Sequence, residues 1–543
     1  MANADQFPPY PFDVAAARYV EHRAWWASDM ATIESIYTGK NSVTHLHNGM
    51  PHRGGVMGSL SKMFWGQPLP AGEDRVRLHL PLAGDVAQKS ASILFGEIPS
   101  IELPDFEEKN KTGQERLNLI MGSDEAHAEL LKSAEYASAL GGAYLAPAWD
   151  IEVADHVFPK AYRADVALPV FRHGRLATVK LWTEYRQDDG QAVFRLIEQH
   201  ERGLIRFTLH EGGERFLGRS VPITTLEETA HYAKLISPVE YLALSTDSKY
   251  TISIATGIEE MAVAYYPNMM PNPDWENLGA LASVGRSDYY GIEPVFDKTD
   301  QLWSSLFRDV ENGAGRVTLP KAYLETGGQG EGSAFDSGRN YYVGIEALGQ
   351  AGDSLASQMQ ISQFEIRDDV HLNVIDALER RVLRTIGLSP KEFGKTNPRG
   401  GTKTGIEVMD DRSETEATRD VKGIYVRPAL AKNARVCLAI DKQVFPGKGG
   451  GEFGTPVVTF ARISQEDPEK RARTLQLLDS ARSIAIEDRV RYRLEGSGAS
   501  EPEIKEQIAR AVAEHESSLL ADPFMQPFDD TDADSDAEQE TEG

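Results

Sequence analysis

Residues 389–403 have the sequence SPKEFGKTNPRGGTK. Two prolines and three glycines interrupt any regular element, so the stretch is predicted to be a loop. It is also basic, with Lys391, Lys395, Arg399 and Lys403 against the single acidic residue Glu392. A solvated surface loop would account for this composition. So would a loop that lies where a polyanion passes, because a few mobile cations make transient contacts with phosphate.

A helix is predicted on each side of this loop. Before it, apolar residues repeat at helical spacing through residues 366–386, and Gly387 supplies a C-cap. After it, Thr404 and Glu407 fit the T-x-x-E capping box that begins a helix. The two helices and the loop between them therefore form one unit of the sequence.

The second of these helices begins with an all-polar segment. Residues 410–420 read DDRSETEATRD, and a helix that is polar all round does not pack in the core of a monomer. It bridges solvent, lines an aqueous channel or packs against another subunit. Pro428 should kink the helix, and the apolar residues 429–440 should return to a core. The residues predicted to face a channel or a neighbouring subunit are Asp410, Asp411, Arg412, Glu414, Glu416 and Arg419.

The rest of the chain mixes helical and strand patterns, which predicts the α+β class. Residues 125–140 predict a helix that the Gly141-Gly142 pair ends, followed by a strand at 144–150. Residues 292–310 predict a second amphipathic helix, whose apolar stripe includes Trp303. Residues 168–220 alternate apolar and polar residues, as in an antiparallel meander, with turn signals at His173-Gly174, Asp189-Gly190 and Gly212-Gly213.

Composition excludes several classes of protein. The chain has 543 residues and a formal net charge of −26, which argues against a protein that grips nucleic acid by charge alone. No apolar run is long enough to span a membrane, and residues 1–10 show no secretory signal. Cys437 is the only cysteine, so neither an internal disulfide nor a multi-cysteine metal site can form. Residues 522–543 hold nine acidic residues and no basic one, and this tail is expected to be disordered.

The sequence contains no motif for an enzyme or a cofactor. We find no P-loop, no dinucleotide fingerprint, no G-x-S-x-G elbow and no H-E-x-x-H pair. His45, His47 and His52 lie close in sequence, but they have no carboxylate support, and we expect no metal there. The chain is therefore expected to have no catalytic residues and no cofactor.

Four stretches in a fixed order resemble the portal proteins of tailed bacteriophages, specifically those of the siphophage type. Residues 79–99 resemble that family's N-terminal helix and the strand after it, and 139–150 resemble its next helix–strand unit. Residues 285–305 resemble the helix that leads toward the base of the ring. Residues 387–408 resemble its tunnel loop and the long kinked helix that follows. The residues that carry the resemblance are HLPLAGD (79–85), SASILFGEIP (90–99), ALGGAYL (139–145), WD (149–150), GRSD (285–288), DQLWSS (300–305), GLSP (387–390) and TGIEV (404–408).

The resemblance implies a portal fold that assembles into a ring, usually a dodecamer, with Trp303 as a candidate for the subunit interface. Double-stranded DNA would pass through this ring during packaging and ejection, and the basic residues of 389–403 would contact it. The implied segments are an N-terminal wing (1–285), stem helix 1 (286–313), a clip (314–360), stem helix 2 (361–387), a tunnel loop (388–403), a long kinked helix returning to the wing (404–464), a helical crown (465–520) and an acidic tail (521–543).

The resemblance also implies partners and a location. The partners would be the large terminase, the capsid protein and scaffold, and a head-completion or adaptor protein, with no membrane involved. The chain would assemble in the host cytoplasm and belong to the virion. Two alternatives remain open. One is another virion assembly protein, such as a capsid or head–tail adaptor protein; the other is a hydrolase that uses carboxylates.

Overall fold

In the computed structural model the chain forms two units, Met1–Phe460 and Ala461–Gly543. The structure describes residues 6–42, 46–47, 50–51, 63–67, 77–104, 111–187, 192–233, 251–312, 316–320, 342–345, 360–362, 368–390, 405–448, 454–460, 473, 475–478, 485–494 and 501–520.

The meander predicted from the alternating pattern is confirmed. Its strands follow the order β10-β9-β8-β7-β6, each antiparallel to the next, and β11 also pairs with β9. The first hairpin turns at His173 and Gly174, which both have positive φ. The β9–β10 turn falls at residues 214–215, just beyond the predicted Gly212-Gly213 pair, because both glycines still belong to β9. The strands are β6 (Ala167–Arg172), β7 (Arg175–Arg186), β8 (Val193–Glu201), β9 (Leu204–Gly213), β10 (Phe216–Val221) and β11 (Thr251–Ala255).

Helix α6 (Asp124–Leu140) leads into a second sheet and packs against two of its strands. The Ser123 hydroxyl accepts a hydrogen bond from the Ala126 N–H at its start, and Gly141 ends it with φ +86°, as the sequence predicts. The strand that follows begins two positions earlier than predicted, at Gly142, and it forms the centre of a three-stranded sheet. That sheet consists of β4 (Gly142–Ala148), β5 (Phe158–Arg163) and β12 (Ala264–Pro267).

Among the described residues, four further helices precede α6 in this unit. Of these, only α4 was expected, from the resemblance. They are α1 (Phe12–Trp26), α2 (Met30–Ser42), α4 (Leu82–Phe95) and α5 (Lys111–Met121). The short strands between them are β1 (Leu46–His47), β2 (Met50–Pro51) and β3 (Ser100–Glu102).

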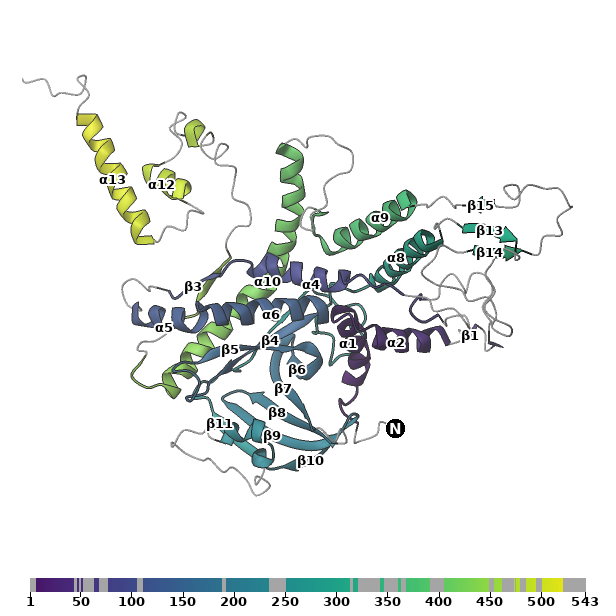
Figure 1. Ribbon diagram of the computed structural model, residues 1–543. Coiled ribbons are helices and arrows are strands. Elements are labelled where there is room, and N and C mark those ends of the chain that lie inside the picture. Colours follow the sequence, from purple (N-terminus) through teal and green to yellow (C-terminus); the bar gives the residue numbers. More distant parts are fainter. Residues whose placement is uncertain are drawn as a thin grey trace, which may run out of the picture. The chain divides into compact units, whose positions relative to one another are not determined.

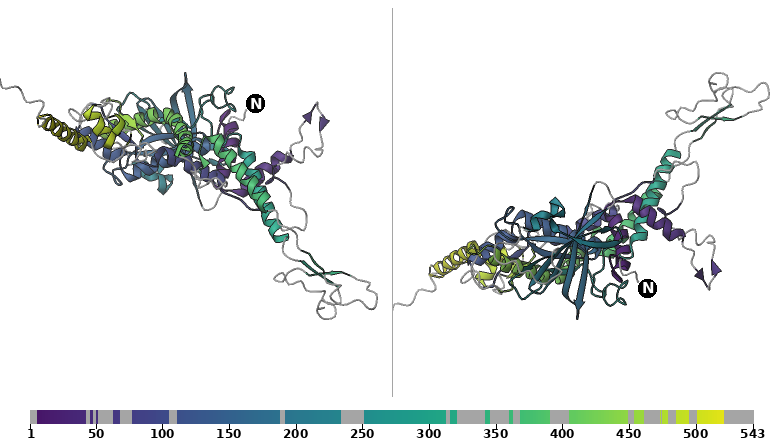
Figure 2. Two further views of the ribbon diagram at one scale, coloured as in Figure 1. Left: turned by 90° about the horizontal axis from the view of Figure 1, so that it is seen from above. Right: turned by 90° about the horizontal axis from the view of Figure 1, so that it is seen from below.

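Helices α8 (Glu293–Asn312) and α9 (Asp368–Ile386) lie side by side, as Figures 1 and 2 show. His371 near the start of α9 contacts Asp309 near the end of α8, so the two helices run antiparallel. The described residues between them in the chain include three short strands, of which β13 pairs parallel with β14 and antiparallel with β15. The strands are β13 (Arg316–Pro320), β14 (Tyr342–Ile345) and β15 (Gln360–Ser362).

Helix α10 (Gly405–Val444) confirms the long helix predicted after the basic loop. It continues through Pro428 and changes direction along its length, as Figure 1 shows in green. Its second half is buried against α5, β4, β5 and β12, as the apolar run 429–440 predicts. Cys437 is fully buried there. The unit ends with β16 (Val457–Thr459), which pairs with β3.

In the described part of the second unit, α12 (Ile486–Leu494) and α13 (Glu501–Leu520) pack on each other. Ile504, Ile508 and Val512 form an apolar stripe on α13, and all three residues are half-buried. The acidic tail 521–543 and the glycine-rich stretch 326–338 lie outside the described residues.

Candidate functional site

The predicted site residues of the basic loop lie outside the described residues. Lys391, Lys395, Arg399 and Lys403 belong to this group, as do the side chains of Asp410, Asp411 and Arg412, whose backbone lies in α10. Their role at a channel or an interface therefore stays a prediction. Helix α9 ends at Ile386, and the described chain stops at Pro390 and resumes at Gly405.

The remaining predicted residues differ in exposure. Glu414 is exposed and Glu416 is half-buried. Arg419 is 8 % exposed and its guanidinium lies over the ring of Phe460, so this side chain packs within the chain. Trp303 is half-buried next to Phe307, and its indole N–H has no partner within the described parts of the chain.

The expectation that residues 410–420 avoid packing within one chain is wrong for one face of α10. The Thr415 hydroxyl accepts from the Ser389 N–H at 3.1 Å, and the Thr418 hydroxyl donates to the Gly387 carbonyl at 2.7 Å. Thr415, Thr418 and Lys422 stand at positions i, i+3 and i+7, so they share one face of the helix. A polar face can pack inside a protein when each polar group finds a hydrogen-bond partner there.

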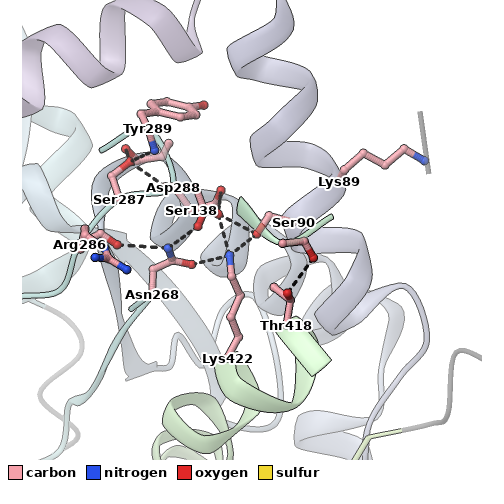
Figure 3. A network of polar contacts seen from close by, with 12 residues as sticks. Lys89, Ser90, Ser138, Asn268, Arg286, Ser287, Asp288, Tyr289, Thr418 and Lys422 are labelled. Carbon is pink, nitrogen blue, oxygen red and sulfur yellow. Dashed lines mark hydrogen bonds and ion pairs between the residues drawn. The ribbon is translucent and has the colours of Figure 1, made fainter. Parts of the chain in front are cut away.

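Lys422 is the centre of a buried polar network, shown in Figure 3. Its ammonium donates to Asp288 Oδ2 at 2.6 Å, to Ser90 Oγ at 2.5 Å and to Asn268 Oδ1 at 2.8 Å. An ammonium has three N–H donors, and here each has an acceptor. The side chains of Lys422 and Asp288 are only 4 % and 5 % exposed.

The Asp288 carboxylate accepts several further hydrogen bonds within the same network. Besides Lys422, it accepts from Ser90 Oγ at 2.9 Å, from Ser138 Oγ at 2.6 Å and from Asn268 Nδ2 at 2.8 Å (Figure 3). Burial by itself would raise the pKa of Asp288, but Lys422 and these hydrogen bonds outweigh it and hold the pKa below its ordinary value. The carboxylate is therefore charged and fully paired inside the protein.

Two glycines set the position of the Asp288 segment. The backbones of Gly141 and Gly285 pass so closely that a Cβ on Gly285 would lie 2.2 Å from the Gly141 carbonyl oxygen. The Ser287 hydroxyl bonds the Ser138 and Ala139 carbonyls, and the Asp288 N–H bonds the Ser138 carbonyl. Two of the stretches that carry the resemblance, 139–150 and 285–305, are thus in direct backbone contact.

A second set of buried carboxylates fixes the start of α8. Asp297 accepts from the N–H groups of Phe64 and Trp65 at 2.8 and 3.1 Å, and Asp300 accepts from the Leu80 N–H and contacts His79. Burial raises the pKa of Asp297 above its ordinary value, although the two N–H donors oppose the rise. Together with the Asp288 network, these contacts hold the base of the α8–α9 pair.

This arrangement is suited to holding helices in place. Lys422 and Asp288 have almost no exposed surface, so no substrate reaches them. Within the described residues, no group of His, Cys, Asp or Glu is placed to hold a metal, and no helix is long and apolar enough to cross a membrane. His47 is described only as part of β1, and His45 and His52 lie outside the described residues.

Sequence reasoning singled out neither Lys422 nor Thr415 and Thr418. The signal that could have found them is the i, i+3, i+7 spacing of three hydrogen-bonding side chains within a segment that otherwise looks like a solvated helix face. Asp288 stands in the GRSD stretch that was quoted for the resemblance, but its partner lies far along the chain.

The comparisons with known proteins identify no family. No protein-family model matches the chain, and no curated protein matches its sequence. Among solved structures, the chain is similar to one titled "Neck of native GTA particle computed with C12 symmetry", with 9 % identity, a TM-score of 0.40, and coverage of 76 % of this chain and 88 % of that chain. The chain is also similar to the neck of an empty GTA particle computed with C6 symmetry, with 10 % identity, a TM-score of 0.38, and coverage of 79 % of this chain and 95 % of that chain. For the virion of a native gene transfer agent particle, the identity is 11 %, the TM-score is 0.37, and the coverage is 79 % of this chain and 95 % of that chain. TM-scores of this size establish neither a common fold nor a common function.

Proposed function

We propose that this chain is a portal-type subunit that assembles into a ring, usually a dodecamer in the family it resembles, at one vertex of a capsid. Double-stranded DNA would pass through the ring during packaging and ejection. The observation that carries the proposal is the helix pair α8–α9, whose one end is tied into the fold and whose other end leaves apolar side chains uncovered.

The uncovered side chains gather at one end of the pair. Asp309 and His371 are in contact, so the end of α8 and the start of α9 lie together. The large apolar residues exposed there are Phe307, Val310, Val370, Leu372 and Val374. A cluster of exposed apolar side chains on a water-soluble surface is typical of an interface with another protein. In a closed ring, one face of each subunit meets a different face of the next, which would cover such residues.

The order of elements supports the same proposal. The resemblance implies two stem helices joined by a clip, then a tunnel loop and a long kinked helix. The described chain has α8, three short strands, α9, the basic stretch and α10 with its internal Pro428, in that order. On this proposal β13–β15 belong to the clip, which would dock the terminase and later the head-completion protein, and the second unit is the crown.

The charge of the chain also fits a conduit. Acidic walls repel phosphate, so DNA passes without being held, and a few cations give transient contacts. The basic residues of 391–403 are the candidates for these contacts. The subunit would contribute no chemistry of its own, and it would assemble with capsid protein and scaffold in the host cytoplasm before it becomes part of the virion.

The experiment that tests the proposal is a native mass measurement of the purified full-length chain, combined with negative-stain imaging. A single subunit has a mass of 59.9 kDa. The expected result is a particle of many such masses with a central hole. A chain that stays monomeric, both alone and when expressed with capsid and scaffold proteins, would overturn the proposal.

A further inference from the structure

One face of α10 contacts both ends of the segment that contains the α8–α9 pair. Thr415 and Thr418 bond the backbone of Gly387 and Ser389, directly after α9. Lys422, on the same face, forms the ion pair with Asp288, shortly before α8 begins at Glu293. Helix α10 therefore contacts both the residues directly after α9 and the residues shortly before α8.

The Lys422 contacts leave the helix little freedom. Its ammonium bonds three residues from three places in the fold: Ser90 of α4, Asn268 after β12 and Asp288 before α8 (Figure 3). An apolar contact permits sliding and rotation, whereas three directed bonds from one buried cation fix the helix both along and around its axis.

Helix α10 needs such a contact because of Pro428. A proline inside a helix lacks the N–H that would bond the carbonyl four residues earlier, and it bends the helix. The buried second half of α10 therefore cannot by itself set the direction of the first half. Lys422 lies on the N-terminal side of the proline, where that direction has to be fixed.

We propose that Lys422 is a positioning residue: its bond to Asp288 sets the first half of α10 against the base of α8, and through Thr415 and Thr418 it sets the end of α9. The value of this arrangement for DNA passage rests on the proposed portal function. The positioning itself does not, because it concerns contacts within one chain.

The test is amide hydrogen exchange of the full-length chain, read by mass spectrometry. The main variant is Lys422→Met combined with Asp288→Asn, because a single change would leave one buried charge unpaired and could unfold the protein. We expect amide exchange at 387–389 and 414–421 to become at least tenfold faster. Exchange in strands β7–β9 and at residues 430–440 should stay as in the unmodified chain.

The matched control is Lys432→Met on the same helix. The Lys432 ammonium is half-buried and donates to the Val263 carbonyl at 2.9 Å, but it does not contact the residues that flank the pair. This variant should leave exchange at 387–389 unchanged. A third variant, Thr415→Val with Thr418→Val, should speed exchange at 387–389 and leave the Lys422 contacts in place.

Two results would overturn the proposal. One is unchanged exchange at 387–389 in the neutral double variant. The other is an equal acceleration everywhere, including β7–β9, which would show that the ion pair supports the whole fold and positions nothing in particular. If the exchange results are as expected but no ring is ever found, the positioning stands and the portal function falls.

Discussion

Arg116 and Asp441 form a buried two-point ion pair between α5 and the second half of α10. Arg116 Nε lies 2.7 Å from Asp441 Oδ2, and Nη2 lies 2.9 Å from Oδ1. The Val157 N–H donates to the same Oδ1 at 3.0 Å. One carboxylate therefore joins α10, α5 and the loop before β5. Helix α10 is held by an ion pair on each side of Pro428, with Lys422 on one side and Asp441 on the other.

Replacing Arg116 by Met should destabilise the first unit by about 3–5 kcal/mol, because the Asp441 carboxylate would stay buried without its cation. The measurement is urea unfolding of the full chain, followed by tryptophan fluorescence. The control is Lys448→Met, which removes the exposed pair with Asp155 and should leave the unfolding midpoint unchanged. Equal shifts in the two variants would contradict the prediction.

Replacing Gly285 by Ala should destabilise the same unit by about 3 kcal/mol, because the new Cβ would overlap the Gly141 carbonyl and Pro267. The shift in thermal unfolding of the full chain measures this effect. Gly174→Ala is the control. Gly174, unlike Gly285, has positive φ, at +75°, but its Cβ would meet open space, so only the backbone penalty of about 1 kcal/mol is expected. A larger loss for Gly174→Ala than for Gly285→Ala would rule out the close-approach explanation.

Asp297 should make stability fall as the pH rises. Burial holds its pKa above the ordinary value in the folded state, so the folded state binds the proton more tightly than the unfolded state does. Stability is then lost between the ordinary pKa and the raised one. The measurement is the unfolding free energy of the unmodified chain and of Asp297→Asn from about pH 4 to pH 7. The free energy of the unmodified chain should fall relative to that of the variant as the pH rises.

For Asp288, the expected dependence of stability on pH has the opposite sign. Its pKa is held below the ordinary value, so its contribution is present at neutral pH and is lost as the pH falls through that lowered value. A variant without the Asp288 carboxylate should therefore differ least from the unmodified chain in strong acid. If Asp297→Asn shows no trend with pH, the buried carboxyl is not protonated in the way its surroundings imply.

Replacing Val310 and Val370 together by Ser should raise the protein concentration required for ring formation at least tenfold. Both side chains are exposed in the single chain, so its own stability should change little. Native mass measurement against concentration tests this. Val153→Ser is the control, because Val153 is also exposed but belongs to the loop between β4 and β5. Rings that form equally well in both variants would show that another surface joins the subunits.

Replacing Lys391, Lys395, Arg399 and Lys403 together by Gln should leave ring assembly intact and reduce packaged DNA several-fold. The reason is the loss of the transient contacts with phosphate that the basic stretch is proposed to make. The control removes the same charge from the meander, at the exposed residues Arg172, Arg175, Lys180 and Arg215. Full packaging by the first variant would refute the role of the basic stretch.

Local patterns predicted the elements whose signals are contained in a few residues. The alternation through 168–220 predicts the meander, and Gly141 and Gly387 mark the ends of α6 and α9, where both residues adopt positive φ. Each of these signals depends only on neighbours in sequence, so it can be recognised without knowledge of the fold.

Contacts between distant residues were beyond the sequence. Nothing near Asp288 indicates that its partner is Lys422, and the polar stretch 410–420 looks the same whether its hydrogen-bond partners are water or the backbone groups of Gly387 and Ser389 after α9. The sequence prediction missed two local signals: Asp29, which caps α2 by accepting from the Thr32 N–H, and the apolar stripe of Leu117, Ile120 and Met121 on α5. Helix α1 has neither a side-chain cap nor a clear stripe. Burial decides such elements, and burial is a property of the assembled fold.

The pairing of β3 with β16 has a consequence for how the chain is made. Residues 100–102 find their partners only at 457–459, and the main hydrophobic core also needs α10 and Phe460. A ribosome must therefore synthesise nearly the whole first unit before that core can close. Prematurely terminated chains would keep apolar surface exposed, and they would go to chaperones or proteases instead of joining finished subunits.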